Sequence, residues 1–116
     1  MKTIHTNNAP AAIGPYSQAI EVNGFIFASG QIPIDPSTGN FVEGGIKEQT
    51  KQAITNAKNI LKEGGTDLAH VVKTTVYLAN MADFAAMIDS MCCWFLVSIV
   101  TRSKQAFTFL RLAERS

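Results

Sequence analysis

Two short blocks of the sequence hold side chains that could do chemistry. Residues 14–19 read Gly-Pro-Tyr-Ser-Gln-Ala, and residues 29–33 read Ser-Gly-Gln-Ile-Pro. Proline holds φ at about −65° and glycine accepts dihedrals that other residues avoid, so the first block predicts a bend that delivers Tyr16 to a defined place. A tyrosine there offers an aromatic face and a phenolic hydroxyl to the wall of a small polar pocket.

Each block also has a plainer interpretation. Tyr16 could be an aromatic packed beneath a turn. Ser29 and Gly30 could mark a strand end, where glycine allows a close backbone approach. Taken one at a time, neither block decides between a site and a structural feature.

The elements around these blocks can be predicted from local patterns. Asn23-Gly24 is a strong hairpin signal because both turn positions need positive φ, so we expect residues 18–22 and 25–29 to form an antiparallel pair. Residues 71–78 are rich in β-branched types and predict a central strand.

Two helices are expected as well. Apolar residues recur at helical spacing from Ile46 to Leu61, which predicts an amphipathic helix with its C-cap at Gly64-Gly65. Asn80 is placed to cap a second helix, whose apolar stripe is Phe84, Met87, Ile88 and Met91.

Composition describes one globular domain. The 116 residues are 47% hydrophobic and 16% charged, and a chain of this size buries roughly two-thirds of its unfolded surface. The net charge of +1 supplies no basic stripe, so we expect no nucleic-acid partner. Residues 91–100, the longest apolar run, are too short to cross a bilayer, and the amino terminus lacks a signal peptide's apolar region. A cytoplasmic protein is therefore expected.

Cysteine and histidine usage gives no metal motif. Cys92 and Cys93 are adjacent, and neighbouring cysteines rarely bond to each other, so reduced thiols are expected. His5 and His70 have no cysteine or carboxylate partner at ligand spacing. The sequence therefore predicts no bound metal.

Four blocks together resemble the RidA family of reactive imine deaminases, which is also called YjgF. They are residues 14–19, residues 29–33, Gln52-Ala53 followed by Asn56, and residues 72–78. The resemblance implies one α+β domain over residues 1–116, with a twisted mixed sheet backed by two helices as in a chorismate mutase from Bacillus. The implied element order is β-β-α-β-α, with one further strand possible.

The same resemblance implies an assembly and a reaction. Family members are homotrimers with a site in each cleft between subunits, and no cofactor is needed. They hydrolyse 2-iminobutanoate and 2-iminopropanoate to 2-ketoacids and ammonia. Tyr16 is expected beside the substrate, where it would order the water, and Ser29 and Gly30 are expected to line the pocket. The family's arginine, in a Pro-Ala-Arg-Ser segment, corresponds in distance to Arg102, whose planar fork suits a substrate carboxylate.

The tail departs from this pattern. The resemblance runs from Lys2 to Met87, whereas residues 88–116 diverge and hold all three arginines, both cysteines and the lone tryptophan, with no glycine or proline. Ile88 replaces a family asparagine, and Glu114 does not fit the closing strand whose glutamate helps to activate water. We hypothesise an out-of-frame or otherwise altered reading of a family gene after residue 87.

Two other functions stay open from the sequence. The missing glutamate is compatible with a ligand-binding or regulatory trimer that lacks turnover. A ribonuclease or translation initiation inhibitor is a label attached to some relatives, but the chain has no basic patch and only two histidines for acid-base work.

Overall fold

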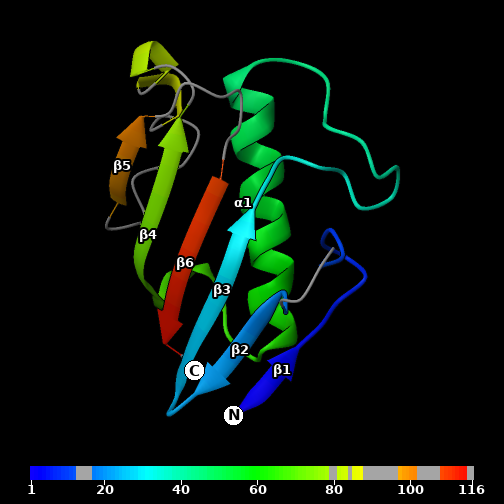
Figure 1. Ribbon diagram of the computed structural model, residues 1–116, viewed down its shortest axis with the longest axis vertical. Helices are drawn as coiled ribbons and strands as arrows, with labels where there is room; N and C mark the ends of the chain where they lie inside the picture. The colour runs from blue at the N-terminus through cyan, green and yellow to red at the C-terminus, as the bar shows by residue number, and fades with distance from the viewer. Residues whose placement is uncertain (13–16, 79–80, 84, 88–96, 102–107, 115–116) are drawn as a thin grey trace.

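Helix α1 (Ile46–Glu63) lies across one face of a six-stranded sheet (Figure 1). The computed structural model describes residues 1–12, 17–78, 81–83, 85–87, 97–101 and 108–114. The strands are β1 (Lys2–Ile4), β2 (Ala19–Val22), β3 (Phe25–Gln31), β4 (Val71–Leu78), β5 (Val97–Thr101) and β6 (Thr108–Glu114). The helix is α1 (Ile46–Glu63), and the 3-10 turns are η1 (Leu68–His70) and η2 (Met81–Asp83).

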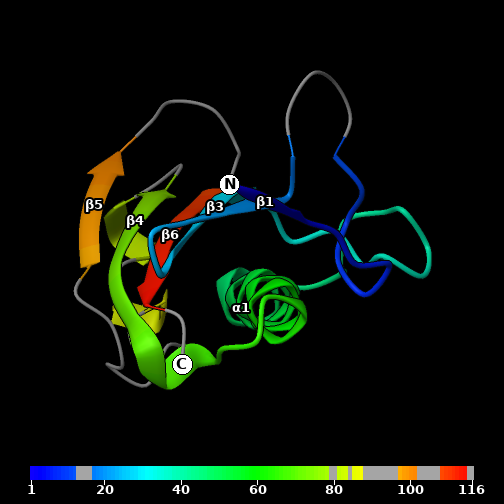
Figure 2. The ribbon, with the colours of Figure 1, turned by 90° about the horizontal axis from the view of Figure 1, so that it is seen from below.

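The sheet is mixed. Its spatial order is β1-β2-β3-β6-β4-β5, with β4 and β5 parallel and every other neighbouring pair antiparallel. Figure 2 shows α1 against one face only. The predicted α+β architecture with a mixed sheet is confirmed, and it is the arrangement of an antiparallel-rich sheet with one covered face.

The first hairpin forms as its turn chemistry predicts. Asn23 and Gly24 have φ of 51° and 82°, and Val22 pairs with Phe25 across the two-residue turn. These positive φ values twist the turn in the sense that antiparallel strands need. The hairpin brings β3, and the Ser29 block at its end, beside β2.

Alternation along β3 decides which side chains enter the core. Ile26 and Ala28 are buried in a cluster with Ile60 and Leu61 of α1, whereas Phe25 and Phe27 are exposed on the other face. Successive side chains of a strand point to opposite faces, so one face of β3 packs on the helix and the other stays uncovered.

The end of α1 follows its glycines. The N–H of Gly65, at φ 83°, donates to Lys62 O, and the N–H of Thr66 donates to Leu61 O. This pair of bonds satisfies carbonyls that the last helical turn leaves free. Gly64 is buried, and a Cβ added there would come within 2.5 Å of Ile26 Cδ1. The predicted C-cap is confirmed.

The strand count differs from the implied order. β1 precedes the first expected strand, and the tail supplies both β5 and β6 instead of at most one strand. β1 is a three-residue edge strand, too short to show a pattern. The tail strands have no glycine or proline to signal turns, although residues 97–101 are rich in β-branched types. Of the predicted second helix, Met81–Asp83 form the 3-10 turn η2 and residues 85–87 are helical, and its other positions lie outside the described residues.

Candidate functional site

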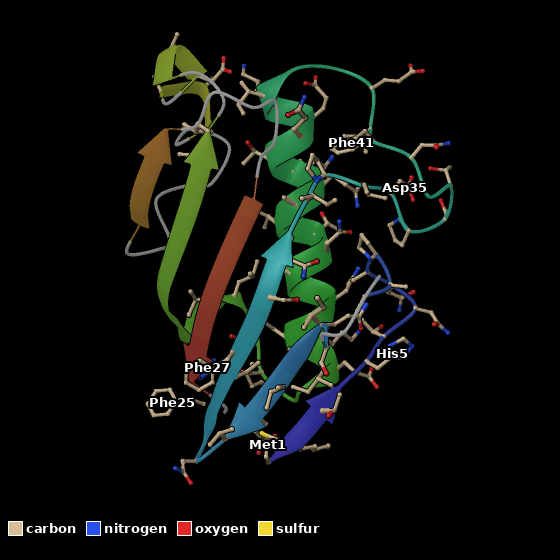
Figure 3. All side chains as sticks on the ribbon, in the orientation of Figure 1. Met1, His5, Phe25, Phe27, Asp35 and Phe41 are labelled. Atoms are coloured by element: carbon tan, nitrogen blue, oxygen red, sulfur yellow. The ribbon has the colours of Figure 1, made fainter. Side chains whose placement is uncertain are left out.

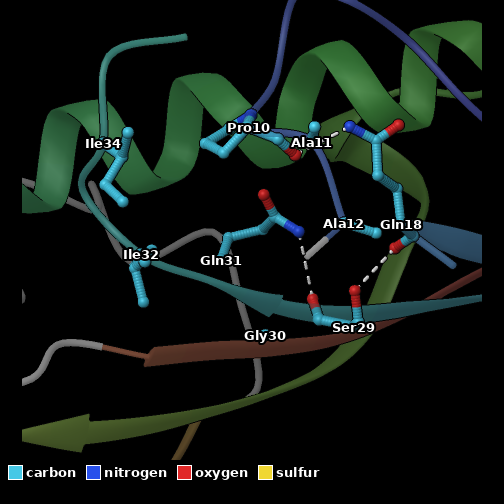
Figure 4. Close-up of a pocket in the computed structure, with 9 residues that line it drawn as sticks. All are labelled: Pro10, Ala11, Ala12, Gln18, Ser29, Gly30, Gln31, Ile32 and Ile34. Carbon is cyan, nitrogen blue, oxygen red and sulfur yellow. Dashed lines mark hydrogen bonds between the residues drawn. The ribbon is translucent and has the colours of Figure 1, made fainter. Parts of the chain in front are cut away.

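A cavity of about 160 Å³ lies where β3 ends, beside the segment that leads from β1 toward β2 (Figure 4). Its walls come from residues 10–12, Gln18, residues 29–32 and Ile34. Ser29 and Gly30, both expected to line a pocket, are therefore brought together in one wall. Tyr16 and Arg102 lie outside the described residues, although Ala12 and Gln18, on either side of Tyr16 in the chain, both line the cavity.

An irregularity in the sheet shapes the Ser29 wall. The pairing of β3 with β6 shifts register between Ala28 and Gln31, so Ser29 and Gly30 sit at a bulge-like interruption. Bulges bend a strand and redirect its side chains, and they are frequent beside active sites. Gly30, which has no side chain, lines the cavity at this point.

Ser29 is held against β2 by two hydrogen bonds to one carbonyl. Its N–H and its Oγ–H both donate to Gln18 O, each at 3.0 Å. The side-chain amide of Gln31 donates to Ser29 O at 3.2 Å. The hydroxyl is thus oriented before any ligand arrives (Figure 4).

The side chain of Gln18 secures the opposite wall. It is only 3% exposed. Its Oε1 accepts from the N–H of Thr6 at 2.7 Å, and its Nε2 donates to Thr6 O at 3.0 Å and to Pro10 O at 2.8 Å. Gln18 therefore joins the 6–10 segment to Ser29 through one residue. The sequence placed Gln18 in a family block but did not identify this role.

Asn56 holds the chain that follows Gly30. It is fully buried on α1, and its Nδ2 donates to Ile32 O at 3.1 Å and to Ile34 O at 2.9 Å. Its Oδ1 accepts from Gln52 Nε2 at 2.8 Å. This contact explains why the sequence blocks 52–56 and 29–33 belong together. The sequence signal that could have revealed this role of Asn56 is its place, as a polar residue, on the apolar face of the predicted helix.

The described wall is electrically neutral. None of its nine described residues carries an ionisable side chain. Nearby in the chain, hydrogen bonds from the Ser37 hydroxyl and N–H hold the pKa of Asp35 below its usual value, but Asp35 belongs to an exposed turn. Among the described histidine, cysteine and acidic residues, no group of three gathers as a metal site would require. No helix in the described part of the chain is long and apolar enough to span a membrane.

The sequence is similar to those of known proteins. The sequence profile described as endoribonuclease L-PSP matches residues 6–100. A RutC family protein of Pyrococcus abyssi is 60% identical over 74% of this chain and 68% of its own length. A mouse protein named 2-iminobutanoate/2-iminopropanoate deaminase is 49% identical over 88% of this chain and 76% of its own length.

The backbone is also similar to those of solved structures. The crystal structure of TdcF from E. coli with bound serine superposes with a TM-score of 0.93 at 29% identity, over 100% of both chains. The sheet and the helix that packs on it therefore form a known fold. The chain belongs to the endoribonuclease L-PSP family, which is the RidA/YjgF family that its sequence blocks resemble.

Proposed function

We propose that this protein hydrolyses small 2-imino acids, of the 2-iminobutanoate and 2-iminopropanoate class, to 2-ketoacids and ammonia. The observation that carries the proposal is the near 50% identity to deaminases so named, which extends over most of the chain. The small neutral wall around Ser29 and Gly30 is compatible with a substrate of four or fewer carbons.

The reaction needs water and no oxidant or reductant. A water oxygen adds to the carbon of the C=NH₂⁺ group, and the C–N bond breaks after the nitrogen has received a proton. The products are a C=O group and NH₄⁺, so that atoms and charge balance. Tyr16 would order the water, Ser29 and Gly30 would contact the substrate, and Arg102 would bind its carboxylate through two charge-assisted hydrogen bonds. No cofactor enters this scheme.

We further propose a homotrimer with sites between subunits, and the uncovered sheet face supports it. Phe25 and Phe27 are 40% and 53% exposed on the face of β3 that α1 does not cover (Figure 3). Adjacent exposed aromatics on a sheet mark an interaction surface. The described cavity wall has no cation for a carboxylate, so a site completed by another part of the assembly is chemically sensible.

A coupled assay tests the activity. Threonine dehydratase releases 2-iminobutanoate from threonine, and semicarbazide traps the imine that has not yet hydrolysed. We expect wild-type protein to lower the rate of semicarbazone formation, Arg102→Ala to abolish the effect, and Lys58→Ala, on the exposed side of α1, to keep it. Unchanged semicarbazone formation at stoichiometric wild-type protein would exclude the deaminase, and full activity of Arg102→Ala would exclude the assigned residue.

A further inference from the structure

We propose that Ser29 meets the ligand as a hydrogen-bond acceptor and recognises an N–H of a nitrogen-bearing substrate. The inference rests on the proposed function and names the substrate group that Ser29 contacts. A serine hydroxyl has one proton and two lone pairs. The proton is already directed at Gln18 O, 3.0 Å away, because a carbonyl oxygen can only accept.

Gln18 O, which accepts the hydrogen bond from the Ser29 hydroxyl, is held in place. The same carbonyl also accepts from the N–H of Ser29, and its two lone pairs suffice for both bonds. Gln18 is buried, and its side chain is bonded to Thr6 and Pro10. Turning the hydroxyl toward a ligand would give up its bond to Gln18 O, which the buried Gln18 network holds in place.

With its proton directed at Gln18 O, Ser29 Oγ can meet a ligand only through its lone pairs, so it selects a hydrogen-bond donor. In a protonated 2-imino acid the nitrogen is the hydrogen-bond donor. The carboxylate, and the keto oxygen of the 2-ketoacid product, are hydrogen-bond acceptors. Ser29 lines the cavity, so it would bind the nitrogen end and would have no proton to offer an oxygen placed there (Figure 4). Hydrolysis replaces C=NH₂⁺ by C=O, so the contact that holds the substrate is lost with the ketoacid, and this loss promotes its release.

Two ligands with one carbon skeleton separate the possibilities. We would measure by calorimetry the binding of 2-aminobutyrate, whose ammonium donates, and of 2-ketobutyrate, whose oxygens only accept, to the full-length protein. Ser29→Ala is expected to weaken 2-aminobutyrate binding about tenfold and to leave 2-ketobutyrate binding within about twofold. Ser29→Thr, which keeps the hydroxyl, should restore the preference. Ser37→Ala, an exposed turn serine, should change neither affinity.

Every other pattern overturns the proposal. Equal losses for both ligands would show a structural role, a selective loss of 2-ketobutyrate would show a donor role, and no loss would show no role. A wild-type protein that bound neither ligand would also overturn it. Selective binding without imine hydrolysis would keep this inference and reject the deaminase, whereas hydrolysis with equal losses would do the reverse.

Discussion

At the residue scale, the candidate site depends on side chains that do not touch a substrate in our scheme. Gln18 contributes its carbonyl to Ser29 and its amide to the 6–10 segment, so one buried residue joins two walls of the cavity. A buried amide with all its partners satisfied gives rigidity, and the same amide becomes costly when a partner is lost. Gln18 is therefore a positioning residue.

Replacing Gln18 by leucine should destabilise the protein by about 2 kcal/mol or more, because the N–H of Thr6 and the carbonyls of Thr6 and Pro10 lose their buried partners. Urea denaturation followed by circular dichroism measures the change. Gln49→Leu makes the same replacement on a half-buried position of α1 and should cost less than about 1 kcal/mol. Equal costs for the two variants would remove Gln18 from its joining role.

At the scale of elements, α1 carries the loop after Gly30 as well as the core. Asn56 bonds the carbonyls of Ile32 and Ile34, which follow β3 directly. Its helix face is otherwise the apolar stripe that periodicity predicts. The helix therefore sets where the second sequence block leaves the sheet.

Asn56→Asp tests this anchoring. The substitution places a carboxylate oxygen against two carbonyl oxygens in a fully buried position, and we expect a loss of about 3 kcal/mol in unfolding free energy at neutral pH. Asn59→Asp is the matched control, because the amide of Asn59 donates to Asn8 O at an exposed site of the same helix. That variant should lose less than about 1 kcal/mol. A small loss for Asn56→Asp would contradict the anchoring.

At the scale of the whole molecule, α1 covers one sheet face, and in the described part of the chain no helix covers the other. α1 covers the side of Ile26 and Ala28, while Phe25 and Phe27 lie on the open side (Figure 3). Burial of such aromatics against a second copy would contribute the hydrophobic free energy that a stable assembly needs. The proposed trimer would therefore form through this face.

Phe27→Glu should dissociate that assembly, because a carboxylate would have to be buried at the contact. Light scattering after size-exclusion chromatography should give a trimer mass for wild-type protein and a monomer mass for the variant. Phe41→Glu alters an aromatic that is 55% exposed in the loop before α1 and should leave the trimer intact. A monomeric wild type, or a trimeric Phe27→Glu, would reject the proposal.

Local patterns determined much of this protein. Asn23-Gly24 determines the hairpin turn, the helical spacing of apolar residues determines α1, and Gly64-Gly65 ends that helix. Each of these features depends on residues only a few positions apart. The sequence blocks at residues 14–19, 29–33, 52–56 and 72–78 identified the family. β1 was too short to predict, and the positions of β5 and β6 were not signalled by turns.

Only the tertiary structure decided how distant segments meet. β6 enters the sheet between β3 and β4, far from β3 in the chain, and the register shift at Ser29 exists only in that pairing. The position of the loop after Gly30 depends likewise on Asn56 of α1, which bonds Ile32 O and Ile34 O, 24 and 22 residues away. Residue types say which groups can donate or accept, but their partners are chosen by packing between segments that no local pattern links.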